Sequence, residues 1–323
     1  MRGQNGHMGS LTDVPGVRVG QVHKAGGGWL TGVTVVLPPP GTVGSVDVQG
    51  GGPATHETDA LDPTSLVSQV DAVVLAGGSA YGLASAAGVQ RWCEENGRGF
   101  AVPGGVVPIV PAAAIFDLGR GGDFSARPTP EMGYAAAAVA AAEAEGHDVG
   151  RGNVGAGTGA LIGRGQYKGG VGAASITLEN GVVVGAIAVV NALGLPFSTT
   201  TQDFDGLNHR EDGLNHQGLN TTLVVVATNA VLDVAECKRT AAASHAGIAR
   251  ALNPSHTLAD GDTVFCLATC GVALDRSDET ARQISLVTLQ SAAADVVRLA
   301  ILDGVASAEP VSTPAGDYGA YGG

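Results

Sequence analysis

Two adjacent threonines, Thr221 and Thr222, stand where a polar segment meets a strongly apolar one. Residues 218–220 are Gly-Leu-Asn, and residues 223–226 are Leu-Val-Val-Val, which is typical of a strand buried in a sheet. A Thr-Thr pair at such a junction is also typical of an ordinary strand start, because threonine has good β propensity. If the bond between Asn220 and Thr221 were cut, however, the new α-amino group of Thr221 could act as the base for its own hydroxyl.

Four other residues carry groups that could assist such a nucleophile. Asp260 and Asp262 flank a glycine, so one carboxylate could orient Thr221, although the same pattern forms an Asx turn that caps a strand. Asn191 ends a predicted buried strand and could donate its amide N–H to a developing oxyanion; a strand-end asparagine is also a common turn residue. Tyr81 lies at the mouth of a predicted strand-to-helix turn, where its phenol could be a second donor or a half-buried aromatic.

The composition sets limits on the class of protein. The 323 residues are 44% hydrophobic and 15% charged, which predicts a globular α/β protein with a sizeable core. The formal net charge of −13 argues against nucleic acid and anionic membranes as partners. Four cysteines without a Cys-x-x-Cys pair indicate reduced core thiols, and no signal peptide or membrane span is evident, so we expect a cytoplasmic protein.

Apolar runs and glycine punctuation predict alternating strands and Ala-rich helices, which must position these side chains. Residues 11–20 are predicted to form a turn and a short strand, and further predicted strands cover residues 31–37, 47–53, 71–76, 181–190, 221–226 and 264–268. Predicted helices end near residue 95 and cover 133–145, 233–252 and 282–302, and the Gly/Pro-rich tail after the last helix is expected to be loose.

A polar stretch from residue 195 to residue 220 separates the two halves of the chain. It repeats Gly-Leu-Asn three times and holds His209 and His216, which we interpret as solvated side chains rather than metal ligands. A loop of this length is uncommon in a compact domain unless it is functional or disordered. The Gly-rich run at 154–160 lacks the lysine and spacing of a phosphate loop, so nucleotide binding is disfavoured.

Together these motifs resemble the DmpA-type family of self-processing N-terminal nucleophile hydrolases, which includes aminopeptidases, β-peptidyl aminopeptidases and nylon-oligomer hydrolases. The matching segments, in the order expected for the family, are LTDVPGV at 11–17, ETD at 57–59, AGGSAYGL at 76–83, VPIVPA at 107–112, VGAGTGA at 154–160, VN at 190–191, GLNTTLVVVATN at 218–229 and DGDT at 260–263. Each segment is weak alone, but the combination is specific and covers nearly the whole chain.

The resemblance implies a single domain over residues 1–323 with a four-layer αββα sandwich fold. It also implies self-cleavage between Asn220 and Thr221 into chains 1–220 and 221–323, with Thr221 as the nucleophile. At matching positions, Tyr81 and Asn191 would contact the substrate carbonyl or oxyanion. Asp260 and Asp262 match the acidic pair of the Thr-type members.

One position departs from the family pattern. A lysine implicated in the nylon-hydrolysing members falls at Arg164, and Lys168 lies close behind it. A guanidinium holds charge but does not act as a base, so a proton-transfer role at Arg164 is in question and the choice between Arg164 and Lys168 stays open.

The leading hypothesis is therefore an amide hydrolase that needs no metal or organic cofactor. It would act on a small molecule, short peptide or oligoamide and form a homo-oligomer of processed pairs, as the resemblance implies. An acyltransferase similar to ornithine acetyltransferase is the alternative enzyme, and a ligand-binding protein that never cleaves itself is the non-enzymatic one. The acidic balance favours substrates with a cationic amine, such as N-terminal amino acid amides or ω-amino acid oligomers.

Overall fold

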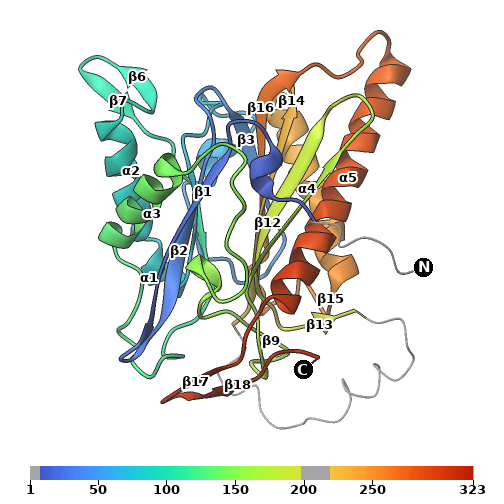
Figure 1. Cartoon of the computed structure of the whole chain (residues 1–323). Coiled ribbons are helices and arrows are strands. Elements are labelled where there is room, and N and C mark those ends of the chain that lie inside the picture. The colour runs from blue at the N-terminus through green and yellow to red at the C-terminus, as the bar shows by residue number, and fades with distance from the viewer. Residues whose placement is uncertain (1–7, 198–218, 323) are drawn as a thin grey trace.

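Two five-stranded sheets lie face to face between two pairs of helices in the computed structural model, which describes residues 8–197 and 219–322 (Figure 1). Helices α2 and α3 cover the first sheet, on the left of the view, and helices α4 and α5 cover the second, on the right (Figure 1). This arrangement is the αββα sandwich, so the predicted fold is confirmed.

The first sheet has the order β1-β2-β5-β8-β4 and the second has the order β11-β12-β14-β16-β3. The first consists of β1 (Arg18–Gly26), β2 (Trp29–Leu37), β5 (Val73–Ala76), β8 (Ala112–Ala114) and β4 (Thr55–His56). The second consists of β11 (Val171–Thr177), β12 (Val183–Asn191), β14 (Thr221–Ala230), β16 (Thr263–Val272) and β3 (Val43–Val48). Strand β14 is the middle strand of its sheet, antiparallel to β12 and parallel to β16.

The helices are α1 (Ser79–Gly82), α2 (Ser85–Glu95), α3 (Pro130–Ala142), α4 (Val234–Ala251) and α5 (Glu279–Ala306). The longer ones follow the predicted segments, although α5 begins earlier and ends later than predicted. Short pairs complete the described chain: β6 (Phe100–Val102) with β7 (Gly105–Val107), β9 (Leu161–Ile162) with β10 (Tyr167–Lys168), β13 (Leu195–Pro196) with β15 (Leu252–Asn253), and β17 (Val311–Thr313) with β18 (Gly316–Tyr318).

The side chains of β14 alternate between two buried layers. Val224 and Val226 pack with α4 and α5 on the outer face of the second sheet. Leu223 and Val225 pack in the layer between the two sheets. Because successive side chains of a strand point to opposite faces, a strand buried on both sides has an unbroken apolar sequence. This explains why residues 223–226 carry no polar alternation.

Helix α5 rests directly on the second sheet. A Cβ added at Gly172 of β11 would lie 2.1 Å from the backbone nitrogen of Gly304 and 2.2 Å from the carbonyl oxygen of Ala300. Only glycine permits this approach, so the small residues of this sequence bring helix and sheet together. Within the described residues, α5 is also the one helix long and apolar enough to cross a membrane, but it packs on α4, β11 and β12 as core helices do.

The segment after α5 is ordered, so the predicted loose tail is wrong. The β17–β18 hairpin is tied to the body of the protein: the Thr313 hydroxyl donates to the Arg120 carbonyl oxygen at 2.7 Å. The Lys168 backbone N–H donates to the Gly319 carbonyl oxygen, also at 2.7 Å. The Gly/Pro composition of this C-terminal segment is typical of a loose tail, but these long-range hydrogen bonds hold the segment in place.

Candidate active site

Thr221 is the first residue of β14 and lies opposite Asn191, the last residue of β12, in the antiparallel register. Both residues are buried, with Thr221 only 4% exposed. By strand alternation, Thr221 faces the layer between the sheets, as Leu223 does, and Thr222 faces α4 and α5, as Val224 does. The two threonines that the sequence leaves equivalent therefore point into different layers.

The peptide bond before Thr221 is held by the loop that contains Asp260. The Asn220 backbone N–H donates to the Ala259 carbonyl oxygen at 3.0 Å, and the Asn220 carbonyl oxygen accepts the Gly261 N–H at 2.9 Å. The Thr221 hydroxyl donates to the same Asn220 oxygen. The hydroxyl thus lies against a carbonyl group that a backbone N–H polarises from the other side.

The carboxamide of Asn191 is oriented by its surroundings. Its Oδ1 accepts a hydrogen bond from Arg120 Nη1 at 2.5 Å and another from the Leu161 N–H at 3.0 Å. Its Nδ2 is buried and has no hydrogen-bond partner within the part of the chain that the structure describes. Because two donors hold the oxygen, the amide N–H₂ is left as a free donor on the strand end opposite Thr221.

Two buried cations lie beside Asn191. Lys168 is fully buried, and its Nζ donates to the carbonyl oxygens of Thr158 at 2.9 Å and Ala160 at 2.7 Å. Burial, reinforced by the nearby Arg120, lowers the Lys168 pKa to about 7, and burial also lowers the Arg120 pKa to about 10. Buried Asp117 is the counter-charge, and burial raises the pKa of its carboxyl. A lysine amine that titrates near neutral pH can gain or lose a proton under working conditions.

Within the described residues neither predicted carboxylate forms a hydrogen bond with the Thr221 hydroxyl. Asp262 Oδ1 accepts the Thr222 N–H at 2.7 Å. Asp260 Oδ2 accepts the N–H and hydroxyl of Thr257, three residues earlier, at 2.9 and 2.5 Å, which is not the Asx turn that the local sequence allowed. Burial is the main cause that raises the Asp260 pKa, with a further contribution from the charge of Asp262.

Tyr81 and Arg164 lie outside this buried cluster. Tyr81 is 57% exposed on α1, and the Arg127 guanidinium lies 3.9 Å from its ring centroid. Within the described residues no hydrogen bond joins Tyr81 to Thr221 or Asn191, so its part in the site stays a prediction. Arg164 is exposed in the turn between β9 and β10, whereas Lys168 points inward from β10.

Sequence reasoning missed Arg120, Asp117 and a histidine, His256, that contacts Asp262. His256 Nδ1 lies 2.8 Å from Asp262 Oδ2. The signal for Arg120 was an arginine set among glycines at 118–122, where a charged side chain has little local partner. His209 and His216 lie outside the described residues, and no group of three potential metal ligands occurs within them.

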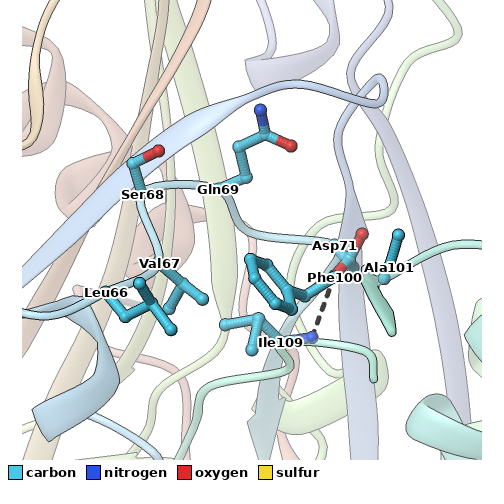
Figure 2. Close-up of a pocket in the computed structure, with 9 residues that line it drawn as sticks. Leu66, Val67, Ser68, Gln69, Asp71, Phe100, Ala101 and Ile109 are labelled. Carbon is cyan, nitrogen blue, oxygen red and sulfur yellow. Dashed lines mark hydrogen bonds between the residues drawn. The ribbon is translucent and has the colours of Figure 1, made fainter. Parts of the chain in front are cut away.

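A separate hollow lies between residues 66–71 and β6 (Figure 2). Leu66, Phe100 and Ile109 line it, and the Asp71 carboxylate beside it accepts the Ile109 N–H at 2.8 Å. It shares no residue with the cluster around Thr221. We therefore place the candidate active site at Thr221.

The buried Lys168 should leave a signature in the dependence of stability on pH. Its folded pKa of about 7 is below the ordinary 10.5, so the folded state binds fewer protons than the unfolded state between these values. Stability of the native protein relative to a Lys168→Met variant should therefore rise with pH through this window, by at most about 1.4 kcal/mol per pH unit.

Urea unfolding of both proteins at several pH values measures this difference. An exposed lysine supplies the control, since Lys24→Met should show no such slope. A difference that stays flat from neutral to alkaline pH would show that Lys168 keeps its ordinary protonation in the fold.

Comparison with known proteins gives a family and several relatives. The model of Peptidase family S58 matches residues 9–318. An uncharacterised aminopeptidase of Mycobacterium tuberculosis H37Rv is 48% identical over 94% of this chain and 96% of its own length. A 6-aminohexanoate-oligomer endohydrolase of Kocuria sp. KY2 is 29% identical over 90% of this chain and 84% of its own.

Solved structures agree on the fold. A β-aminopeptidase of Burkholderia sp. matches with a TM-score of 0.73 and 22% identity, over 100% of this chain and 93% of its own. The L-aminopeptidase D-Ala-esterase/amidase of Ochrobactrum anthropi, described as a variant of the Ntn hydrolase fold, matches with a TM-score of 0.74 and 23% identity, over 99% of this chain and 93% of its own. The resemblance to the DmpA-type hydrolases is confirmed, and the chain belongs to Peptidase family S58.

Proposed function

We propose that this chain is a self-cleaving amide hydrolase in which the hydroxyl of Thr221 is the nucleophile. Membership of a peptidase family makes it a hydrolase of amide bonds and favours hydrolysis over the acyltransferase alternative. The observation that supports the choice of Thr221 is its orientation: its side chain faces the inter-sheet layer opposite Asn191, while that of Thr222 faces the helices.

In the uncut chain, the Thr221 oxygen attacks the carbonyl carbon of Asn220. The negative charge that develops on the Asn220 oxygen is stabilised by the Gly261 N–H, which already contacts it at 2.9 Å. The C–N bond then breaks and the Thr221 nitrogen takes up the proton, which leaves Asn220 as an ester of the hydroxyl. Water hydrolyses the ester to an Asn220 carboxylate and a free Thr221 amine.

In turnover, the free amine takes the proton of the Thr221 hydroxyl as the hydroxyl attacks a substrate amide. The unpaired Nδ2 of Asn191 donates to the oxyanion of the tetrahedral intermediate, with Tyr81 as a predicted second donor. The leaving amine departs with a proton, and water then releases the acyl group from Thr221. The buried Lys168 and Arg120 lower the cost of negative charge at this point.

Two substrate classes fit this chemistry. The relative at 48% identity is named an aminopeptidase, which supports amides of N-terminal amino acids. The Asp260-Gly261-Asp262 pattern matches the Thr-type members, and a relative at 29% identity acts on 6-aminohexanoate oligomers, which supports ω-amino acid oligoamides. Both carry a cationic amine that suits the acidic protein. A cytoplasmic location stays a prediction from the composition, and a homo-oligomer of cleaved pairs stays a prediction from the resemblance.

Substitution of the two threonines separates the nucleophile from its neighbour. Thr221→Ala should abolish both self-cleavage and hydrolysis, and Thr221→Ser should keep cleavage, because only the hydroxyl is needed. Thr222→Val is the matched control, since the Thr222 hydroxyl is buried without a hydrogen-bond partner among the described residues. It should cleave like the native protein and unfold at an equal or higher temperature.

Denaturing electrophoresis of freshly purified and incubated protein gives the result directly. A Thr221→Ala protein that still separates into chains 1–220 and 221–323 would rule out this mechanism.

The role of Asn191 can be tested with an isosteric pair. Asn191→Asp keeps an oxygen for Arg120 and the Leu161 N–H but removes the Nδ2 donor, so kcat should fall by about 10²–10³ while KM changes little. Asn191→Ala should lose the same activity and also stability, because it leaves the buried Arg120 without this acceptor. A native kcat in Asn191→Asp would remove Asn191 from the oxyanion site.

Processed enzyme assayed on two substrate panels decides between the classes. Aminoacyl p-nitroanilides should be hydrolysed if the enzyme is an aminopeptidase, and 6-aminohexanoate oligomers if it is an oligoamide hydrolase. N-acetylation of either substrate should raise KM at least about tenfold, since it removes the cationic amine. Equal rates on acetylated and free substrates would contradict the proposed preference for a cation.

A further inference from the structure

A series of contacting side chains runs from the residue after the proposed nucleophile through the outer layer of the second sheet. It begins at the Thr222 N–H, continues through Asp262 and His256 to His245, and ends at Asp47. These residues come from β14, the approach to β16, the loop after α4, α4 itself and β3. None of the mechanistic steps above uses either histidine.

Asp262 is 1% exposed and divides its two oxygens between two tasks. Oδ1 accepts the Thr222 N–H at 2.7 Å, and Oδ2 accepts the His256 N–H at 3.0 Å and lies 2.8 Å from His256 Nδ1. A buried carboxylate needs such partners because desolvation is costly. His256 therefore supplies both a backbone and a side-chain contact to the oxygen that does not touch β14.

His256 adopts a backbone conformation that histidine seldom does. Its φ is +55°, in the left-handed region, which is unfavourable for a residue with a Cβ. This conformation brings its backbone N–H and its ring to the same Asp262 oxygen. The strain is located at the one residue that contacts Asp262 twice.

The second histidine supports the first. The rings of His245 and His256 meet edge to face with centroids 4.9 Å apart, and His256 Nε2 lies 3.4 Å from the His245 carbonyl oxygen. His245 Nε2 lies 3.1 Å from the Asp47 carbonyl oxygen and 3.6 Å from its Oδ2, and Lys238 forms an ion pair with the other Asp47 oxygen. The charged groups around His256 are thus Asp262, Asp260 and, through His245, Asp47 with Lys238.

We propose that His256 is a positioning residue for the nucleophile: it fixes Asp262 so that this carboxylate holds the Thr222 amide and, with it, the start of β14. The inference rests on the proposed function, because it matters only if Thr221 is the nucleophile. His256 touches neither Thr221 nor the substrate carbonyl. It acts through Asp262 and one peptide group, and a shift of that peptide moves the Thr221 hydroxyl away from its line of attack.

The ionisation of the two rings agrees with this geometry. Burial lowers the His256 pKa, but the hydrogen bond and charge of Asp262 outweigh it, so the net shift is upward. Burial dominates at His245 and lowers its pKa. The two shifts therefore favour the protonated ring at His256, beside Asp262, and the neutral ring at His245.

Two variants and one control, all made in the full-length protein, test the proposal. His256→Ala should lower kcat at least about tenfold with a smaller change in KM, and should slow self-cleavage. Its rate should also depend on pH differently, because the variant lacks the imidazole whose pKa is raised beside Asp262. His256→Asn should restore most of the rate, because asparagine tolerates the left-handed backbone and keeps an N–H donor.

His147→Ala is the control for a histidine with a structural role alone. Its ring nitrogens lie 3.0 Å from the Ala144 carbonyl oxygen and 3.1 Å from the Val19 carbonyl oxygen. His256 and His245 also contact backbone carbonyl oxygens, but within the described residues no contact links His147 to Asp262. His147→Ala should lower the melting temperature and leave the pH profile in place. Thermal unfolding identifies any variant that fails to fold, and His256→Asn then carries the test.

The outcomes separate this inference from the proposed function. If Thr221→Ala is inactive but His256→Ala keeps the native kcat and pH profile, the positioning role is wrong and the nucleophile stands. If His256→Ala changes only the melting temperature, as His147→Ala does, the role is structural and the proposal is overturned. If Thr221→Ala still cleaves and hydrolyses, the proposed function itself fails.

Discussion

The alternation of side chains along β14 is the constraint on which the site depends. A strand buried on both faces has two environments, and a residue's parity decides which one it enters. Thr221 shares parity with Leu223 and so faces the layer between the sheets, whereas Thr222 shares it with Val224 and faces the helices. A slip of one residue would exchange the two hydroxyls, and the register with β12 prevents it by placing Asn191 opposite Thr221.

At the start of β14, the two faces of the sheet are lined by different ionisable groups. The inter-sheet face meets loops of the first half of the chain, which bring Arg120 and Lys168 to the Asn191 side and supply cationic charge. Burial of these cations is costly and lowers their pKa values, and Asp117 and backbone carbonyl groups offset part of that cost. The outer face carries Asp262 and the histidines, which act on the backbone. Basic side chains, with Asp117 beside them, therefore lie on the face where the proposed oxyanion would form, and Asp262 lies on the other face.

Much of this could be predicted from sequence because the signals were local. A window of a few residues is enough to predict the apolar run after Thr222, the strand that ends at Asn191 and the Ala-rich helices. The contacts of Arg120 and of the tail hairpin could not be predicted in this way, because their partners lie far away in the chain: Arg120 contacts Asn191, and the Gly319 carbonyl oxygen accepts the Lys168 N–H. Resemblance supplied the layered topology, which neither periodicity nor composition could give. It pointed to Arg164, and burial distinguishes the exposed Arg164 from the inward Lys168.

The position of Asp262 also limits which group can act as the base. Asp262 directs one oxygen to the Thr222 N–H and the other to His256, and within the described residues it forms no hydrogen bond with the Thr221 hydroxyl. Asp260 accepts both of its hydrogen bonds from Thr257 on one oxygen, Oδ2, and likewise forms none with that hydroxyl among these residues. The acidic pair, which was expected to orient Thr221, therefore contacts the backbone and Thr257 instead of the Thr221 hydroxyl. The proton of the hydroxyl is left to an amine, and the α-amine of Thr221 becomes available only when the Asn220 bond is cut. In the proposed mechanism, cleavage would then create the base as well as expose the nucleophile, and we expect an uncut chain with the same side chains in place not to turn over substrate.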